Sequence, residues 1–385
     1  MCVLHGKDKE SLLLSNDYDI YVINPEGLEW LFGARANNPD PVRLGYVASK
    51  FDVLCIDESH KFKATNTNRF KLIRKVVGKF KRRYIMTGTL NPTGLLDIFG
   101  QMFLLDQGGA LGAYITAYKA RYFHMMPGDQ YGLYPNVGAF EQVGEKIAPY
   151  MLRVGRREIP DLPNLTFSDR MVDLPPLAMR AYHAAERDMI VQIESGAVVA
   201  ANAAVASSKC RQIANGFIYD ENGDVTRFHS EKLEDLKALI EELAGEPLIV
   251  TYEFQEDRDL LIQELGVPSI STGNARKDDE TIQRFRRGAY PVVIGSTPSI
   301  SLGLDGLQDV CGHIFMYGVT WKLSDYLQVI DRVRRQGSKH ANVVIHRCLA
   351  RGTVDERVVR KLDEREGEMI DFMELLEELR TPTIV

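Results

Sequence analysis

The chain has 385 residues, of which 45% are hydrophobic and 26% charged, a composition typical of a folded globular protein. Its five cysteines are scattered and form no C-x-x-C pair, which argues against a disulfide framework or a zinc site. No apolar run approaches the roughly 18 residues of a membrane span, and no secretory leader opens the chain, so we expect a cytoplasmic protein. The net charge of −6 alone argues against a nucleic-acid binder, but the charge is unevenly spread.

The N-terminal part begins with two short apolar runs, residues 2–4 and 20–23, which we expect to be strands. A third run, residues 51–56, is apolar without alternation, which predicts a strand buried on both faces of a parallel sheet. Asp57 and Glu58 follow it directly, at the edge where open α/β sheets bind ligands. An Asp at this edge can hold Mg²⁺ through water, and a Glu beside it can accept a proton from an attacking water.

A basic stretch, residues 61–83, contains ten Lys or Arg and no Asp or Glu. Apolar residues recur with helical spacing within residues 69–80, so an amphipathic helix with a solvated basic face is one interpretation. The other interpretation is a site for the phosphates of a nucleic acid. Both can hold together.

The next strand, residues 83–89, ends at Thr87-Gly88-Thr89, and one helix separates it from the strand before Asp57. The two strands of such a βαβ unit end at the same edge of a sheet, so we expect both strand ends to share one edge. Two further helices are expected at residues 91–106 and 111–122.

The second half of the chain alternates strands and helices. An Ala-rich helical stretch from residue 177 to about 216 and a helix over 230–244 come first. Strands are then expected at 247–252, 290–297, 313–317 and 342–349, with helices between them at 254–265, 278–288 and 322–335. This alternation predicts a separate doubly wound α/β domain.

One helix of this domain carries a polar cluster. The run Q-V-I-D-R-V-R-R-Q-G would place Gln328, Asp331, Arg332 and Arg335 one helical turn apart on a shared face of the helix over 322–335. A plain basic helix is the alternative. Arginines on a rigid helix keep their planar guanidinium groups aimed at phosphate, so two of them facing an acidic Mg²⁺ site would complete a nucleoside-triphosphatase.

Four motifs, in this order, resemble those of superfamily-two helicases, especially the Swi/Snf-type DNA-dependent ATPases in their short phage versions. They are Asp57-Glu58-Ser59-His60, Met86 to Asn91, the turn Ser296 to Asp305, and the Q-V-I-D-R-V-R-R-Q-G run. The resemblance covers nearly the whole chain and implies an α/β fold of two RecA-like lobes with doubly wound parallel sheets and an inserted helical segment. The implied parts are an incomplete first lobe over 1–165, a linker and helical insertion over 166–228, and a second lobe of the helicase C-terminal type, with a C-terminal helix, over 229–385.

The resemblance implies a role for each matching residue in the two catalytic motifs. Asp57 would be the Mg²⁺ ligand, and Glu58 the base that orients and deprotonates the attacking water. Arg335 would be the arginine finger, Arg332 its partner on the phosphates, and Gln328 would position their helix. ATP and Mg²⁺ are therefore the implied cofactors.

Other matching residues are implied to sense the nucleotide or touch DNA, which is expected to be double-stranded. His60, Thr87 and Thr89 would couple the nucleotide state to the grip on nucleic acid. Gly303 and Asp305 would lie near the nucleotide. The positions that commonly touch the DNA backbone are Asn24, Thr251, Ser296 and Thr297.

The chain departs from the family in one important respect. A phosphate-binding loop has the pattern G-x-x-x-x-G-K-[ST], but the only Gly-Lys pairs, Gly6-Lys7 and Gly78-Lys79, are followed by Asp and Phe. We therefore expect a truncated first lobe. There are three explanations for the missing loop. An upstream polypeptide supplies it, it lies upstream of a wrongly assigned start, or it has been lost.

Three functions remain. The first is an ATP-dependent DNA helicase or translocase of phage replication, recombination or repair, inactive alone and working in the cytoplasm of a bacterial host. The second is a non-catalytic DNA-binding remnant, and the third is the motor fragment of a restriction-type nuclease complex. The intact residues Asp57, Glu58, Arg332 and Arg335 favour the first function, and nothing in the sequence indicates a nuclease metal cluster.

Overall fold

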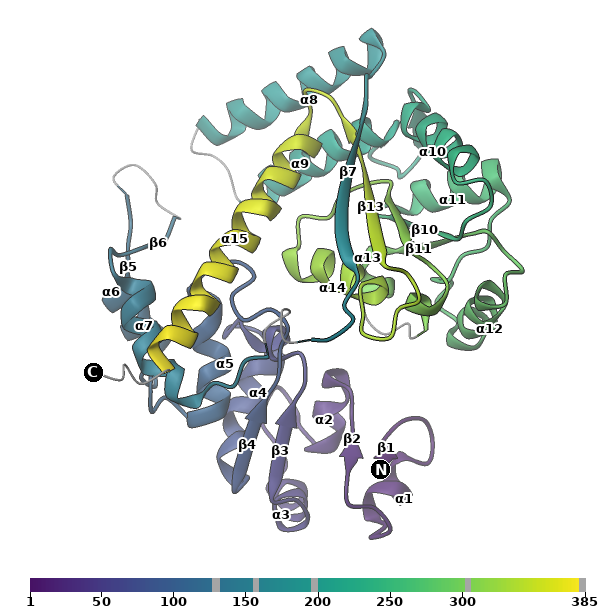
Figure 1. Cartoon of the computed structure of the whole chain (residues 1–385). Helices are drawn as coiled ribbons and strands as arrows, with labels where there is room; N and C mark the ends of the chain where they lie inside the picture. The colour runs from purple at the N-terminus through teal and green to yellow at the C-terminus, as the bar shows by residue number, and fades with distance from the viewer. Residues whose placement is uncertain (127–131, 155–158, 195–199, 302–305, 381–385) are drawn as a thin grey trace. The chain divides into compact units, whose positions relative to one another are not determined.

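The computed structural model describes residues 1–126, 132–154, 159–194, 200–301 and 306–380 (Figure 1). The chain divides into two compact units, a first unit of Met1–Arg153 with Arg365–Val385 and a second unit of Val154–Glu364. The expected lobe boundaries at 165 and 228 both fall inside the second unit. Residue 165 lies in a strand of the second unit's sheet, so this strand does not belong to the first unit. The C-terminal tail, which was expected in the second lobe, instead buries Phe372 and Leu376 in the core of the first unit.

Two parallel strand pairs lie in the first unit. The strand β1 (Cys2–Val3) pairs with β2 (Tyr21–Val22), and β3 (Val53–Ile56) pairs with β4 (Arg82–Ile85). A short antiparallel pair, β5 (Phe123–His124) and β6 (Tyr134–Pro135), completes the strands described there. The helices of this unit are α1 (Lys9–Leu14), α2 (Leu28–Leu31), α3 (Pro41–Lys50), α4 (Asn68–Val76), α5 (Leu96–Asp106), α6 (Ile115–Tyr122) and α7 (Ala139–Ile147).

The prediction that the strand before Asp57 is buried on both faces is wrong. Ile56 is 7% exposed, but Val53 is 49% exposed and Cys55 is exposed as well. On the neighbouring strand β4, Tyr84 is 53% exposed. Parallel sheets are normally covered on both faces, whereas this two-stranded sheet has one face in the core and one in solvent. We call Val53, Cys55 and Tyr84 the bare face.

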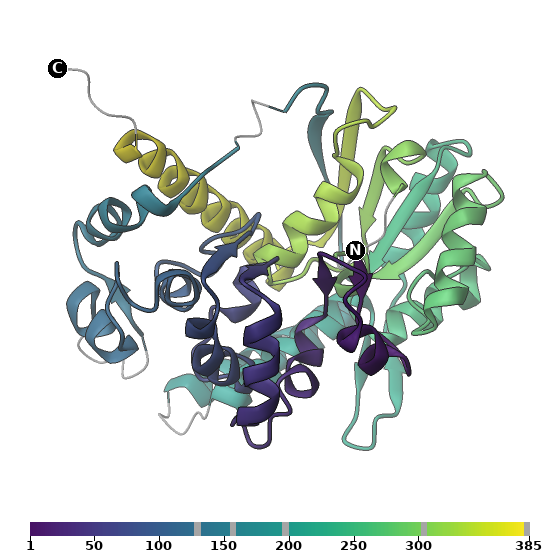
Figure 2. The ribbon, with the colours of Figure 1, turned by 90° about the horizontal axis from the view of Figure 1, so that it is seen from below.

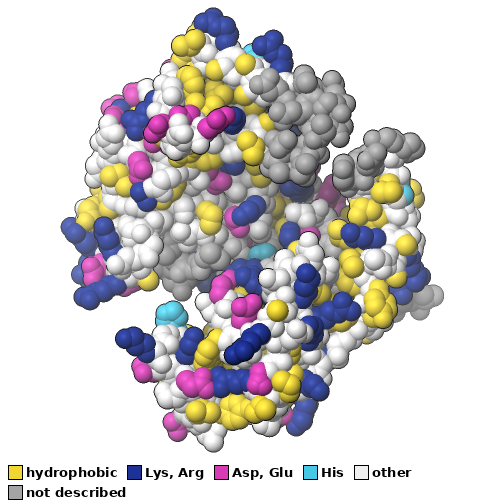
Figure 3. Space-filling model, turned by 180° about the vertical axis from the view of Figure 1, so that it is seen from behind, with side chains coloured by type: hydrophobic (Ala, Val, Ile, Leu, Met, Phe, Trp, Pro, Cys, Tyr) yellow, Lys and Arg dark blue, Asp and Glu magenta, His cyan; other side chains and the backbone are white. Residues whose placement is uncertain are grey.

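The basic stretch forms the amphipathic helix that its apolar spacing predicts. Helix α4 begins after Thr67, whose hydroxyl accepts a hydrogen bond from the backbone N–H of Phe70 at 3.2 Å. Its buried side chains are Phe70, Leu72, Ile73 and Val76. On the face of the molecule drawn in Figure 3, Lys and Arg side chains are interspersed with Asp and Glu. Binding of nucleic acid by this stretch stays a prediction.

The second unit is built on a five-stranded sheet, and this confirms the predicted α/β class with a parallel sheet. The strand order is β11-β10-β12-β13-β7, with every neighbouring pair parallel. The central strand β10 is buried at all five positions, as a strand covered on both faces must be. The strands are β7 (Asn164–Val172), β10 (Leu248–Tyr252), β11 (Val292–Ser296), β12 (His313–Met316) and β13 (Asn342–Ala350).

Helices pack along this sheet (Figure 2). They are α8 (Pro176–Glu194), α9 (Ala200–Asn215), α10 (Glu231–Glu242), α11 (Gln255–Leu265), α12 (Ala275–Arg286), α13 (Thr297–Ser301), α14 (Leu323–Val333) and the first part of α15 (Val354–Arg380). A hairpin of β8 (Phe217–Tyr219) and β9 (Val225–Arg227) follows α9. None of the described helices is long and apolar enough to cross a bilayer.

A buried ion pair joins distant parts of the second unit. Lys232 of α10 is 0% exposed, and its Nζ lies 2.6 Å from Oδ2 of Asp355 at the start of α15. Lys232 also donates to Oδ1 of Asn215 in α9 at 2.9 Å. Asp355 Oδ2 accepts a further hydrogen bond from the backbone N–H of Ala350 at 3.1 Å. The pair therefore ties three helices and β13 together.

A pair of histidines should make this unit sensitive to acid. His313 Nδ1 lies 3.1 Å from His346 Nε2, and burial, then the His313 and Arg170 charges, lower the pKa of His346 from 6.5 to about 4. In the unfolded protein His346 is protonated below about pH 6.5, whereas in the folded protein it stays neutral down to about pH 4. We expect the free energy of unfolding to fall by about 1–3 kcal/mol across this interval.

Urea titrations between pH 7 and pH 4 measure this effect. Because other groups also titrate in this range, the comparison is with His346→Gln, whose unfolding free energy should fall less steeply. Equal slopes for the two proteins would contradict a role for His346.

Candidate functional site

The acidic pair lies where β3 ends. Glu58 has backbone angles of φ 50° and ψ 51°, the left-handed region that a residue other than glycine seldom adopts. Asp57 Oδ1 accepts a hydrogen bond from the backbone N–H of Glu58 at 2.9 Å and so stabilises this conformation. Such strain persists where the surrounding structure enforces it, and it is frequent at functional sites.

The strained backbone turns the Glu58 side chain towards the end of the neighbouring strand. Glu58 Oε2 lies 3.1 Å from His60 Nδ1, and the same nitrogen lies 3.3 Å from Oγ1 of Thr87, which follows β4. His60 is 8% exposed. The structure thus brings Glu58, His60 and Thr87 together at one edge, as expected from the βαβ arrangement.

Thr87 and Thr89 form a tight polar turn beside this edge. Thr87 Oγ1 donates to the Thr89 carbonyl at 3.0 Å and accepts from the Thr89 N–H at 3.1 Å. Thr89 Oγ1 and Asn91 Oδ1 are buried and have no hydrogen-bond partner within the described part of the chain. Buried polar atoms are nearly always paired in stable structures, so this turn is a candidate for rearrangement on binding a ligand.

Two buried residues connect these motifs, and one of them, Gln101, was missed by the sequence analysis. Ser59 Oγ donates to Gln101 Oε1 at 2.7 Å, and Gln101 Nε2 donates to the Leu90 carbonyl at 2.6 Å. Both side chains are 0% exposed. A glutamine within an otherwise apolar helix is the signal that could have identified Gln101, because a buried amide needs polar partners.

The predicted DNA contacts of the second unit lie at a topological switch point. From β10 the chain leads to β11 on one side and then to β12 on the other, and a ligand crevice is expected beyond the carboxyl ends of such strands. Ser296 ends β11, and Thr251 lies one residue before the end of β10. Thr251 is 1% and Thr297 3% exposed, which does not fit a direct contact of either side chain with DNA.

The other two of these residues are more accessible. Ser296 is partly exposed, and its Oγ donates to Ser299 Oγ at 2.7 Å. Asn24 in the first unit is exposed, and its Oδ1 accepts the Gly27 N–H at 3.1 Å, which caps the turn before α2.

The helix predicted over 322–335 ends two residues earlier, at Val333. Arg334 has ψ 75°, outside the helical region, and Gly337 has φ 82°, so the chain turns away here. Gln328 and Arg332 stay on α14, and Arg332 Nη2 donates to the Ser301 carbonyl at 2.6 Å. Arg335 is exposed beyond the helix, so the shared helical face does not include it. Gly303 and Asp305 lie outside the described residues.

The acidic end of β3 is compatible with Mg²⁺. Mg²⁺ keeps several waters and is usually held by one or two carboxylates together with substrate phosphates. The exposed Asp57 carboxylate fits this requirement. Across the described ranges, no group of three or more His, Cys, Asp or Glu could hold a metal ion. The acidic pair belongs to the first unit and Arg332 and Arg335 to the second, so their approach stays a prediction.

Comparison with known proteins finds similarity along the whole chain. Residues 231–337 match the helicase conserved C-terminal domain. A protein designated p41, of Acyrthosiphon pisum secondary endosymbiont phage 1, is 27% identical over 373 residues, which are 94% of this chain and 78% of p41.

Among solved structures, the Sulfolobus solfataricus SWI2/SNF2 ATPase core in complex with dsDNA is 22% identical to this chain, with a TM-score of 0.42. The match covers 98% of this chain and 79% of the Sulfolobus chain. The C-terminal part of the Fun30 ATPase domain is 13% identical, with a TM-score of 0.43, over 57% of this chain and 97% of that one.

Proposed function

We propose that this chain is a helicase of superfamily two that hydrolyses ATP and couples hydrolysis to movement along DNA. Its residues 231–337 match the helicase conserved C-terminal domain. The family match confirms the predicted helicase resemblance. The order of the four motifs supports the Swi/Snf type. The similarity to p41, a phage protein, supports the phage setting of the proposed role in replication, recombination or repair.

The observation that carries the proposal is the arrangement around Glu58. A glutamate in a left-handed conformation follows a strand of a parallel pair, and His60 bridges it to Thr87 at the end of the other strand. Carboxylates placed at this edge are suited to a nucleotide and its metal ion. A change at Glu58 is therefore transmitted directly to the Thr87–Thr89 turn.

In the proposed reaction, Asp57 would hold Mg²⁺, and the bound ion would supply positive charge to the phosphates. Glu58 orients the attacking water and accepts its proton. Arg332 and Arg335 of the second unit stabilise the charge that develops on the transferred phosphoryl group, and arginine fingers of this kind contribute roughly 10³–10⁵ in rate. Gln328 positions α14.

Because the two charged sets belong to different units, hydrolysis requires the units to close on each other. His60, Thr87 and Thr89 transmit this closure to the polynucleotide. Double-stranded DNA is the proposed partner, contacted by the exposed Asn24 and Ser296 and by the basic stretch 61–83. The buried Thr251 and Thr297 support the shape of the crevice.

The phosphate-binding loop is proposed to come from an additional segment, such as an upstream polypeptide. The 385 residues contain no G-x-x-x-x-G-K-[ST] pattern. The bare face supports this proposal, because parallel sheets are normally covered on both faces, whereas the described residues leave Val53 49% and Tyr84 53% exposed.

The chain alone should therefore show negligible ATP hydrolysis. Purified protein, duplex DNA and Mg²⁺-ATP are combined, and phosphate release is followed. Release at the background rate is expected, because nothing cradles the β and γ phosphates. Robust turnover would refute the need for an added loop.

Extension of the chain with the reading frame directly upstream tests the function itself. If that frame encodes the loop, the extended protein should hydrolyse ATP and be stimulated by duplex DNA. An extended protein that has the loop and binds DNA without turnover would favour the non-catalytic remnant.

A further inference from the structure

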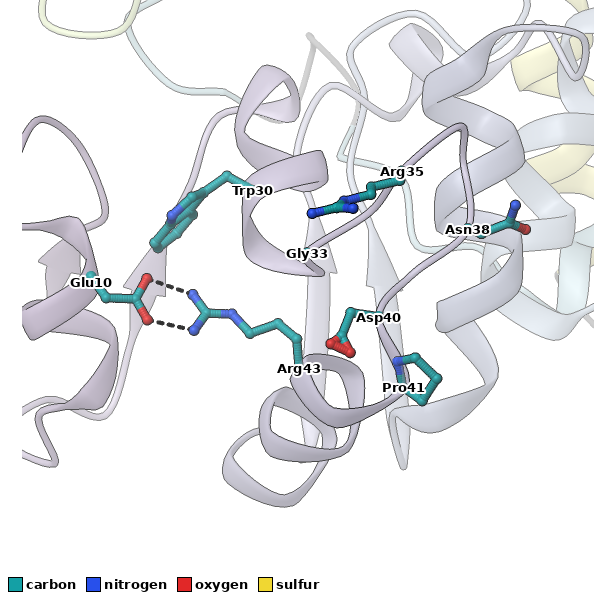
Figure 4. Close-up of a pocket in the computed structure, with 8 residues that line it drawn as sticks. All are labelled: Glu10, Trp30, Gly33, Arg35, Asn38, Asp40, Pro41 and Arg43. Atoms are coloured by element: carbon teal, nitrogen blue, oxygen red, sulfur yellow. Dashed lines mark hydrogen bonds and ion pairs between the residues drawn. The ribbon is translucent and has the colours of Figure 1, made fainter.

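A pocket near the N-terminus of the first unit has no part in the proposed reaction. Its volume is about 570 Å³, within the usual range for small-molecule sites. Residues of α1, α2, α3 and the loop before α3 line it around one indole ring (Figure 4). The lining residues that carry the argument are Glu10, Trp30, Arg35, Asn38, Asp40 and Arg43.

Both carboxylates of this pocket are already engaged. Glu10 forms a two-pronged ion pair with Arg43, with oxygen–nitrogen distances of 2.5 and 2.8 Å, and this pair lowers the pKa of Glu10. Asp40 Oδ1 accepts the backbone N–H of Val42 at 3.1 Å and caps α3. The Arg35 guanidinium extends towards Trp30 (Figure 4) and forms no ion pair with any residue in the described ranges. Arg35 is thus the cation available to a ligand.

The indole ring attracts positive charge. Lys9 Nζ lies 4.6 Å and Arg43 Cζ 5.2 Å from the centroid of the Trp30 ring. An aromatic ring with cations around it is the combination by which proteins hold unpaired nucleotides, because bases stack on the ring and phosphates meet the cations. A base that stacks on the ring where Lys9 now lies would take the place of this side chain.

The turn that carries Arg35 is strained. Arg35 and Asn38 exchange two backbone hydrogen bonds of 2.9 Å, and the residues between them, Ala36 and Asn37, have φ 47° and 62°. A two-residue turn with both central residues left-handed normally contains glycine, and the left-handed conformation costs an alanine about 1–2 kcal/mol. Such strain marks positions that the surrounding structure holds for a purpose.

Helix α4 holds this turn in place. Lys75 Nζ donates to the Asn37 carbonyl at 3.0 Å and to Asn38 Oδ1 at 2.6 Å. Asn37 Nδ2 donates to Asn68 Oδ1 at 3.1 Å. The turn that carries Arg35 is therefore held in place by α4 before any ligand arrives.

We propose that this pocket binds one nucleotide unit, with the base against Trp30 and the phosphate on Arg35. The nucleotide belongs to an unpaired strand or is free in solution, since both present the same base and phosphate. This site is distinct from Glu58 and from the exposed Asn24, and it requires neither the phosphate-binding loop nor hydrolysis.

The fluorescence of Trp30 reports the contact directly. The chain has two tryptophans, so Trp321→Phe leaves Trp30 as the single emitter. This protein is titrated with an oligothymidylate, with AMP and with a duplex of equal length, and saturable quenching by the oligothymidylate or by AMP is expected. Quenching by AMP identifies a site for free nucleotide, whereas quenching by the oligothymidylate alone identifies a site for a strand.

Arg35→Ala should weaken this binding about tenfold or more, since it removes a charge-assisted hydrogen bond. Arg121→Ala, which removes an exposed arginine from α6 of the same unit, should change it less than about twofold. Equal effects of the two substitutions, or none of Arg35→Ala, would overturn the proposal. Absence of quenching, or quenching by the duplex alone, would overturn it as well. Since no arm uses ATP hydrolysis, the result is independent of the proposed function.

Discussion

Glu58→Gln should reduce ATP turnover by about 10²–10⁴-fold while nucleotide binding is retained. The amide has the size and shape of the carboxylate but cannot accept a proton from water. It also loses the charge that faces His60 Nδ1 at 3.1 Å, so coupling to Thr87 should weaken too. The measurement is phosphate release at saturating duplex DNA by the form that carries a phosphate-binding loop, together with its affinity for labelled ATP.

The matched control is Glu145→Gln on α7, which changes an exposed glutamate of the same unit. Its turnover should equal that of the unchanged protein. Unchanged turnover of Glu58→Gln would remove Glu58 from the role of base. Loss of both turnover and nucleotide binding would assign it a part in holding the nucleotide instead.

Asp355→Ala should destabilise the second unit by about 3–5 kcal/mol. The substitution leaves the Lys232 ammonium, 0% exposed, without its carboxylate partner at 2.6 Å. It also removes the acceptor of the Ala350 N–H. Urea unfolding followed by far-ultraviolet circular dichroism measures the change as a shift of the midpoint at constant slope.

Two further variants test whether the unpaired buried charge causes this loss of stability. The double variant Lys232→Met with Asp355→Asn removes both charges and keeps an acceptor for Ala350, so it should recover much of the loss. Glu280→Ala breaks the exposed pair Arg276–Glu280, whose side chains are 90% and 63% exposed, and should cost less than about 1 kcal/mol. If Asp355→Ala costs no more than Glu280→Ala, the buried pair does not stabilise the unit.

The sequence predicted those parts of the fold that local pattern controls. The strand before Asp57 and the four later strands of the second sheet carry short apolar runs between turn residues, and each lies where expected within a few residues. The meeting of His60 with Thr87 followed from the rule that parallel strands joined by one helix end at the same edge.

Features that depend on distant residues could not be predicted in this way. The strand β7 pairs with β13, about 178 positions away, so nothing near residue 164 indicates that it belongs to the second sheet. Arg335 leaves α14 because the backbone turns at Arg334 and Gly337, and its helical spacing gave no sign of this. Thr251 matches a DNA-contact motif, but its neighbours in the sheet on both sides bury it.

The pocket around Trp30 was also missed, because its residues come from separate elements and share no motif. The engagement of Glu10 by Arg43, which leaves Arg35 as the available cation, depends on side chains 33 positions apart.

The exposed side of β3 and β4 has a consequence for the protein in solution. Apolar side chains exposed on a pair of strands adhere to one another, so copies of this chain are expected to associate through the bare face. Among the cysteines, Cys55 alone is exposed, while the other four are buried. A thiol-specific dye would therefore label this one surface and show, at each protein concentration, how much of it has become inaccessible through self-association.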